Sequence, residues 1–240
     1  MKSDLSTGEV ILRKTIPIII NSFNQYTYLR NLIEKLKSDG FANFIILDNA
    51  STYPELQKYY KCLERTNDAL IIYYGGNYGP HFFHQKGLYK VFGSLPHIYT
   101  DPDLSYDDLA DNFLTELMIA AEKYSMFKVG PALEIPRNED IDKSMYCVQN
   151  GKRYTIAEWE GQWWTEQVEP GYYYPGRIDT TFHLFTPKYF ERGSALMNGI
   201  RIGKSGFIFK HLPWYRNKDM PEIEIKYYKT VASEKNSWKS

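Results

Sequence analysis

Two aspartates separated by one proline, Asp101-Pro102-Asp103, are the residues whose types and spacing most clearly indicate chemistry in this chain. They directly follow a short run with strand character, His97–Thr100. In extended backbone, side chains at i and i+2 point to the same side, and the proline favours an extended conformation for Asp101. Two converging carboxylates form an oxygen-only site that suits Mg²⁺ or Mn²⁺ carrying a phosphate. Because Asp and Pro are also common in turns and at helix starts, these three residues alone leave both interpretations open.

The first half of the sequence alternates predicted strands with predicted helices, which is typical of right-handed βαβ units and a parallel sheet. We expect strands over 16–20, 44–47, 70–74, 97–100 and 128–135, and helices over 29–36, 55–64, 82–92 and 107–124. Ser105 and Asp108 have the spacing of a capping box at the start of the last helix. The sequence therefore predicts an α/β fold with a mostly parallel central sheet flanked by helices.

Polar residues stand where each of these strands ends. They are Asn21 and Ser22, Asp48, the turn residues Asn77 and Gly79, and the pair Asp101 and Asp103. Parallel sheets bind ligands beyond the carboxyl ends of their strands. The pattern predicts a nucleotide-type crevice at this edge, although Asp48 could instead cap a turn and Asn77 and Gly79 could simply form one.

The composition of the chain excludes some classes of partner and location. The 240 residues carry 29 Lys plus Arg and 29 Asp plus Glu, and this balance argues against a nucleic-acid partner. We expect no transmembrane segment, because the most apolar run, Ile16–Ile20, is far too short to span a bilayer. A polar start without a signal-peptide core, and only two cysteines, predict a soluble cytoplasmic protein that could lie against a membrane.

The second half is less regular. Helical character covers 155–168, loops are expected over 136–154 and 170–177, strands over 177–185 and 206–212, and a short helix over 187–192. The chain from 216 to 240 is polar. With no internal repeat and no clear linker, one domain spanning residues 1–240 is the simplest expectation.

Several enzyme motifs are absent. No Gly-x-Gly-x-x-Gly follows the first strand, and neither a P-loop nor a Gly-x-Ser-x-Gly elbow occurs. The ordered motifs that are present, Pro17–Asn24, Ile46–Ser51, Asn77–Gly79 and Asp101–Asp103, resemble a GT-A-fold glycosyltransferase of the family-2-like group. The resemblance covers roughly residues 15–135 and, more weakly, the chain to about 215. It implies a nucleotide-sugar-binding half over 15–135 and an acceptor and sugar half over 136–215, followed by a polar tail.

The resemblance also implies roles for individual residues. Asp48 would contact the base of a nucleotide-sugar, Asp101 the ribose or the metal, and Asp103 the metal directly. Lys86 stands seven residues after Gly79, where related enzymes often place a basic residue facing the nucleotide; a solvated helix face is the alternative. His211 would complete the metal shell, or simply pack before Pro213.

Asp179 is the candidate catalytic residue. An acid in an otherwise apolar segment either pairs with a neighbour such as Arg177 or faces a cleft. In many GT-A enzymes this region lines the sugar pocket, so Asp179 would contact the sugar or deprotonate the acceptor hydroxyl. Inversion at the anomeric carbon is expected, although the chain lacks the Glu-Asp pair that many family-2 enzymes carry at the start of a late helix.

The function that these residues predict is a glycosyltransferase dependent on Mn²⁺ or Mg²⁺. It would move a sugar from a nucleotide-diphosphate donor, with UDP expected, to a glycan or other hydroxyl acceptor. A haloacid-dehalogenase-type phosphatase is a weaker alternative, because its aspartate motif follows the first strand and needs a later metal motif that is missing here. A nucleotidyltransferase would usually carry a glycine-rich basic loop where Asn21–Gln25 stands. A non-catalytic sugar-binding module would have no need for Asp101 and Asp103.

Overall fold

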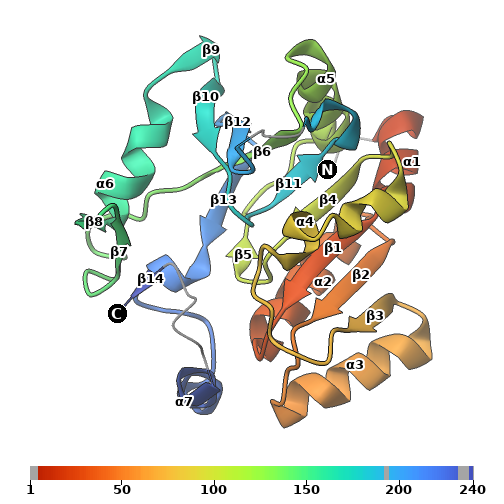
Figure 1. Ribbon diagram of the computed structural model, residues 1–240, viewed down its shortest axis with the longest axis vertical. Helices are drawn as coiled ribbons and strands as arrows, with labels where there is room; N and C mark the ends of the chain where they lie inside the picture. The colour runs from red at the N-terminus through yellow and green to blue at the C-terminus, as the bar shows by residue number, and fades with distance from the viewer. Residues whose placement is uncertain (1–4, 192–194, 232–237, 240) are drawn as a thin grey trace.

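The computed structural model describes residues 5–191, 195–231 and 238–239, and its centre is a large mixed sheet (Figure 1). The first four long strands are β1 (Ile18–Ser22), β2 (Phe44–Asp48), β3 (Ala69–Tyr73) and β4 (His97–Thr100). They are all parallel and lie in the order β3-β2-β1-β4. Ser22 pairs with Asp48 and Ile20 with Thr100. The register therefore brings the carboxyl ends of these strands to one edge, as the sequence predicts.

Helices cover both faces of this parallel half. The helices α2 (Tyr26–Ser38) and α3 (Pro54–Thr66) pack with alternate strand residues such as Ile18 and Ile20 in the main core. On the opposite face, Ile19 and the other intervening residues pack under α4 (Phe82–Gln85) and the 3-10 helix Leu88–Phe92. The expected single helix over 82–92 is broken at Gly87, whose φ of 69° lies in the left-handed region.

The second half extends the same sheet with mixed strand directions. Its strands are β6 (Lys128–Leu133), β9 (Gln167–Glu169), β10 (Tyr172–Arg177), β11 (His183–Phe185), β12 (Asn198–Ile202) and β13 (Ile208–His211). The strand β11 runs antiparallel between β4 and β6, and β12 runs parallel to β6. The expected loop over 170–177 is thus a strand. The expected strand over 177–185 is wrong in its first part, because β10 ends at Arg177. Only the last three residues of the expected strand, His183–Phe185, return to the sheet, as β11.

The helix expected at residue 107 begins later. Leu104 and Ser105 form β5, which pairs with His211 and Lys210 of β13, and α5 runs over Phe113–Lys123 with Asn112 at its N-cap position. The predicted capping box is therefore wrong, because Ser105 is held in a strand by a segment more than a hundred residues away.

Further elements lie outside the central sheet. The helices are α1 (Thr7–Thr15), α6 (Ile156–Gly161) and α7 (Glu222–Val231). Three more 3-10 helices cover Gln162–Trp164, Pro187–Tyr189 and Leu212–Trp214. A small separate sheet consists of β7 (Tyr146–Gln149), β8 (Lys152–Thr155) and β14 (Trp238–Lys239). The segment expected to be a loop over 136–154 thus contains a hairpin. The polar C-terminal segment contains α7, which stands beside the start of α2 in Figure 1.

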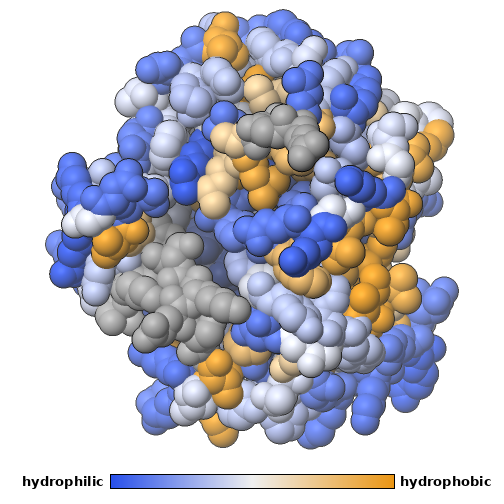
Figure 2. Space-filling view, in the orientation of Figure 1, coloured by the Kyte–Doolittle hydropathy of each residue, from blue (hydrophilic) through white to orange (hydrophobic). Residues whose placement is uncertain are grey.

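Exposed hydrophobic side chains of the parallel half include Leu70 and Ile72 on β3 and Leu95 before β4. Figure 2 shows hydrophobic groups gathered on the right-hand side of the molecule, over these strands. Among the helices that the structure describes, none combines the length and the apolar character needed to cross a bilayer.

Candidate functional site

The Asp101-Pro102-Asp103 segment links β4 to β5 and is fixed from both sides by main-chain hydrogen bonds. The Asp101 N–H donates to the carbonyl of Thr180 over 2.9 Å, and the Leu212 N–H donates to the carbonyl of Asp103 over 2.9 Å. Both partners come from the second half of the chain. The two carboxylates are therefore positioned by β4 on one side and by the β10–β11 and β13 segments on the other.

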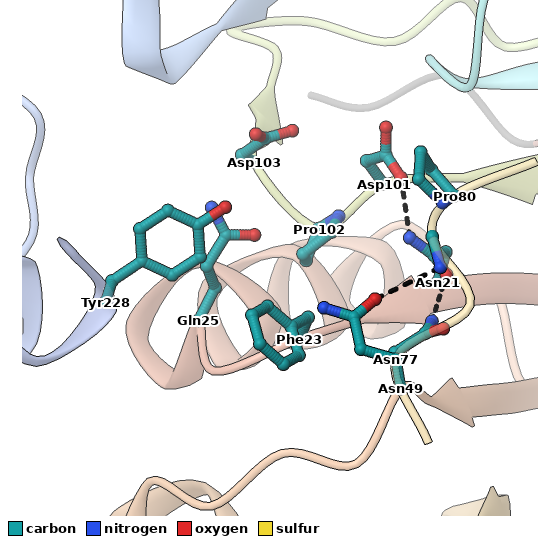
Figure 3. Close-up of a pocket in the computed structure, with 11 residues that line it drawn as sticks. Asn21, Phe23, Gln25, Asn49, Asn77, Pro80, Asp101, Pro102, Asp103 and Tyr228 are labelled. Carbon is teal, nitrogen blue, oxygen red and sulfur yellow. Dashed lines mark hydrogen bonds between the residues drawn. The ribbon is translucent and has the colours of Figure 1, made fainter. Parts of the chain in front are cut away.

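Asp101 lies within a network of amides and hydroxyls. One carboxylate oxygen accepts a hydrogen bond from Asn21 Nδ2 at 3.2 Å, and the other accepts one from the Thr180 hydroxyl. Asn21 in turn accepts a hydrogen bond from Asn49 Nδ2 at 2.6 Å (Figure 3). Desolvation raises the pKa of Asp101 well above its usual range, and the nearby charge of Asp103 raises it further. Both carboxylate oxygens of Asp101 thus accept hydrogen bonds from other side chains of the protein.

Asp103 has a different environment. Its Oδ2 lies 3.5 Å from His211 Nε2, and both side chains are mostly buried. Its Oδ1 is buried, as is His211 Nδ1, and within the described residues neither atom has a hydrogen-bond partner. Buried polar atoms without partners are rare in native proteins, and a bound ion or water is one explanation for them. The side chains of Asp103 and His211 therefore fit two ligands of a divalent cation.

The protein would not fill such a cation's shell alone. Across residues 5–191, 195–231 and 238–239, no group of three or more His, Cys, Asp or Glu is arranged to hold a metal. Mg²⁺ and its analogues are commonly held by one or two protein carboxylates together with substrate phosphates and water. The donor set fits a metal that is bound jointly with a phosphate-bearing ligand.

Two adjoining cavities meet at this segment. The smaller has a volume of about 110 Å³ and the larger about 770 Å³. Five residues line both, namely Gln25, Pro80, Asp101, Asp103 and Tyr228. The carboxylates thus stand at the junction of the cavities. In Figure 3, Asp103 and Asp101 lie on either side of Pro102, and a hydrogen bond joins Asp101 to Asn21.

The smaller cavity combines amide groups with two aromatic rings. The Gly79 N–H donates to Asn77 Oδ1 at 3.0 Å, and Gly79 has a φ of 84°, which only glycine adopts readily. Phe23 and Tyr228, with ring centroids 6.3 Å apart, supply the aromatic wall. Asn21, Asn77, Gly79 and Asp101 therefore come together as predicted. Phe23, Gln25 and Tyr228 were not foreseen, since nothing in the sequence separates them from other polar and aromatic residues.

Ser22 and Asp48 are buried away from both cavities. The Asp48 carboxylate accepts hydrogen bonds from the Ser51 N–H at 3.2 Å and the Tyr60 hydroxyl at 3.0 Å, and that hydroxyl lies 2.8 Å from Ser22 Oγ. These bonds give Asp48 the turn-stabilising role that the sequence left open. Lys86 is exposed at the end of α4 and also lines neither cavity. A nucleotide contact by these three residues stays a prediction.

Asp179 lines the larger cavity, in the connection between β10 and β11. Its Oδ1 lies 3.2 Å from His81 Nε2, so its close side-chain neighbour is His81 rather than Arg177. Lys128 Nζ donates to the carbonyls of Ile178 and Asp179, at 3.1 and 2.9 Å. Burial lowers the pKa of Lys128 to about 7, against the opposing effect of Asp179 and Asp101. The main chain around Asp179 is thereby fixed while its carboxylate faces the cavity.

The comparisons with known proteins agree with this architecture. No protein-family model and no curated protein matches the sequence. Among solved structures, GalNAc-T7 with UDP, GalNAc and Mn²⁺ is 13% identical over 82% of this chain, with a TM-score of 0.51. The chain spans only 43% of the length of that structure. The chain has a GT-A-like fold.

Two further similar structures are a mannosyltransferase of Pyrobaculum calidifontis in complex with GDP-Man and Mn²⁺, and HddC of Yersinia pseudotuberculosis complexed with GMP-PN. The mannosyltransferase is 11% identical, with a TM-score of 0.49, and the match covers 96% of this chain and 74% of that protein. HddC is 10% identical, with a TM-score of 0.48, and the match covers 90% of this chain and 99% of that protein. In this GT-A-like fold, the aspartate pair lies after the fourth parallel strand, where the sequence predicted a ligand site.

Proposed function

We propose that this protein is a metal-dependent glycosyltransferase that uses a nucleotide-diphosphate sugar, with UDP as the expected nucleotide. The observation that carries the proposal is the pair Asp103 and His211, each of which has a buried polar atom without a partner among the described residues. Asp103 lines both cavities, and His211 lines the larger one. A diphosphate placed at this junction would extend a nucleoside into the smaller cavity and a sugar into the larger one. GalNAc-T7, which shares the fold, is described with UDP, GalNAc and Mn²⁺.

The residues of the two cavities would have different roles. Phe23 and Tyr228 offer apolar ring surfaces to a nucleobase or ribose, and the Asn77–Gly79 turn lets the backbone approach it closely. Asp103 and His211 would hold the cation, which when bound neutralises the negative charge that develops on the leaving diphosphate. Asp101 keeps the segment in place through Asn21 and Thr180.

Asp179 is the proposed general base. Its carboxylate faces the larger cavity and its backbone carbonyl is held by Lys128. From there it would accept the proton of an acceptor hydroxyl as that oxygen attacks the anomeric carbon. An attack opposite the leaving diphosphate inverts the configuration at that carbon, so we expect an inverting reaction.

Calorimetric titration with UDP tests the proposal. Wild-type protein should bind UDP in the presence of MnCl₂ and at least tenfold more weakly after chelation with EDTA, because two ligands for a shared cation correspond to more than about 1.4 kcal/mol. Asp103→Asn should lose the metal-dependent part. Asp107→Asn, the same change on an exposed aspartate of the next segment, should keep it. Wild-type protein that binds UDP equally with and without metal, or not at all, would refute the proposal.

A further inference from the structure

Some of the basic residues that line the larger cavity have no acidic partner within the described part of the chain. Four of its lining residues are Arg or Lys, and two of these are paired with acids of the same cavity. Arg201 contacts the buried Glu160, and Lys218 Nζ lies 2.9 Å from Asp142 Oδ2. The remaining acids belong to the aspartate pair and to Asp179, which faces His81.

Arg177 is one of the two cations left over. Among the described residues, no carboxylate oxygen lies within 4.0 Å of its guanidinium or of the Lys229 ammonium, the other unpaired group. Lys229 is exposed on α7, whereas Arg177 is half-buried at the end of β10. Arg177 therefore lines the cavity with a charge that no nearby carboxylate of the described residues compensates, and partial burial reduces the screening of that charge by solvent.

Aromatic packing holds the Arg177 side chain in place. Its Cζ lies 5.4 Å from the ring centroid of Trp159, which also lines the cavity. Its charge is close enough to Lys128 to lower that residue's pKa, in addition to the larger effect of burial. Arg177 therefore lines the cavity close to a second basic residue, the buried Lys128, and its positive charge is felt there.

We infer that the larger cavity binds a sugar that carries a carboxylate, and that Arg177 is the residue that recognises it. The identification of the ligand as a sugar rests on the proposed function. The carboxylate site itself depends only on Arg177 and its surroundings. The Arg177 guanidinium lies beside the Trp159 ring, and its planar set of N–H groups matches the two oxygens of a carboxylate. The place of Arg177 two residues before Asp179 puts the anionic group beside the reacting hydroxyl. The carboxylate can belong to the transferred sugar or to the acceptor.

Calorimetry in two arms distinguishes these sources. In the donor arm, UDP-glucuronate and UDP-glucose are compared in the presence of MgCl₂. In the acceptor arm, D-glucuronate and methyl glucoside are compared with and without UDP and MgCl₂. Wild-type protein should bind the carboxylate-bearing member of one pair about tenfold more tightly, which is the order expected for a charge-assisted, bidentate hydrogen bond. Preference in the first arm assigns the carboxylate to the donor, and preference in the second assigns it to the acceptor.

Variants test the role of Arg177. Arg177→Gln should abolish the preference, and Arg177→Lys, which keeps the charge but not the planar fork, should reduce it. Arg153→Gln is the matched control, because Arg153 also stacks on an aromatic ring, with its Cζ 3.6 Å from the Tyr146 centroid, but does not line the cavity. Equal binding of both members of each pair by wild-type protein, or a preference that survives both substitutions of Arg177, would overturn the inference. A carboxylate preference without any UDP binding would support it while refuting the proposed glycosyltransferase function.

Discussion

Asp101 and Asp103 are identical residues two positions apart, yet their surroundings suit them to different roles. Both oxygens of Asp101 accept hydrogen bonds from the protein, from Asn21 and Thr180. Asp103 keeps one oxygen without a partner among the described residues and directs the other towards His211. The first aspartate is therefore suited to positioning and the second to binding a cation. The chain bends at Pro102 and Asp103, and both aspartates line the same two cavities.

Replacement of Asp179 by Asn should separate binding from transfer. The amide keeps the size of the side chain but cannot take the proton of the acceptor hydroxyl, so kcat should fall by about 10²- to 10⁴-fold. The Kd for UDP should change less than about twofold, because the residue faces the larger cavity only. Transfer and UDP binding would be measured in parallel, with the exposed Asp108→Asn as the matched control. An unchanged kcat in Asp179→Asn would remove this residue from the mechanism.

Lys128 should make stability depend on pH. Its pKa in the folded protein is lowered to about 7, mainly by burial, whereas an unfolded lysine titrates near about 10.4. Between these values the unfolded chain binds more protons, so the free energy of unfolding should rise with pH from this residue, by at most about 1.4 kcal/mol per pH unit. The cost of burying the charge is fully present below the folded pKa and disappears above the unfolded one.

Urea denaturation of wild type and Lys128→Met across this pH range measures the effect. The stability of wild type relative to the variant should be flat in acid and should rise above neutral pH, since the variant lacks the group. Parallel curves for the two proteins would show that Lys128 titrates normally. The same variant should weaken the hold on the Ile178 and Asp179 carbonyls, and therefore also lower transfer.

At the scale of elements, Glu9 and Arg13 attach α1 to the fold, and the buried Glu9 carboxylate makes the contact with α5. Glu9 accepts hydrogen bonds from the N–H groups of Leu114 and Thr115 at the start of α5, at 3.0 and 2.9 Å. It also accepts from the Thr115 hydroxyl at 2.7 Å and from Arg13 Nε at 2.8 Å. A carboxylate at a helix N-terminus satisfies orphan N–H groups and interacts well with the helix dipole. One side chain thus joins α1 to α5.

Glu9→Gln should therefore be strongly destabilising. The substitution leaves the buried guanidinium of Arg13 without its charged partner, and removal of one member of a buried pair costs about 3 kcal/mol or more. Glu34→Gln, which removes an exposed acid near Arg30 on α2, should change stability by less than about 0.5 kcal/mol. Urea midpoints at neutral pH would measure both, and equal midpoints for the two variants would contradict the account of α1.

Two of the elements that sequence reasoning missed, β12 and α1, share a physical cause. The strand β12 lies inside the sheet although Arg201 interrupts its apolar pattern, and Glu160, 41 positions earlier, contacts that arginine. In α1, Glu9 and Arg13 are buried for the same reason. Their charges are compensated only by tertiary partners, which local patterns do not reveal. The parallel strands were predictable because their apolar runs need no such partners.

At the scale of the whole molecule, the candidate site is assembled from both halves of the chain. The strand ends from Asn21 to Asp103 form one wall and were predictable, since a parallel sheet collects them at one edge. Asp179, Arg177 and His211 reach the larger cavity from connections whose placement depends on the mixed strand order. Tyr228 reaches both cavities from α7, in a segment that composition alone describes only as polar.

The attachment of α7 should therefore influence ligand binding. Glu224 is buried and accepts hydrogen bonds from the Thr27 N–H at 2.9 Å and the Thr27 hydroxyl at 2.6 Å, at the start of α2. Tyr228 stands four residues later, on the same face of the helix. Loosening the contact at Glu224 should thus move the ring that lines both cavities.

Glu224→Gln should weaken UDP binding about three- to tenfold and lower stability by about 1 to 2 kcal/mol, because the amide replaces a carboxylate that accepts two hydrogen bonds. Glu222→Gln, the same change on an exposed residue of α7, should alter neither. UDP titration and hydrogen exchange of the α7 amides would be measured on both variants. The expected result is faster exchange in α7 together with the loss of affinity. Faster exchange with unchanged UDP affinity would show that α7 is not part of the nucleotide site.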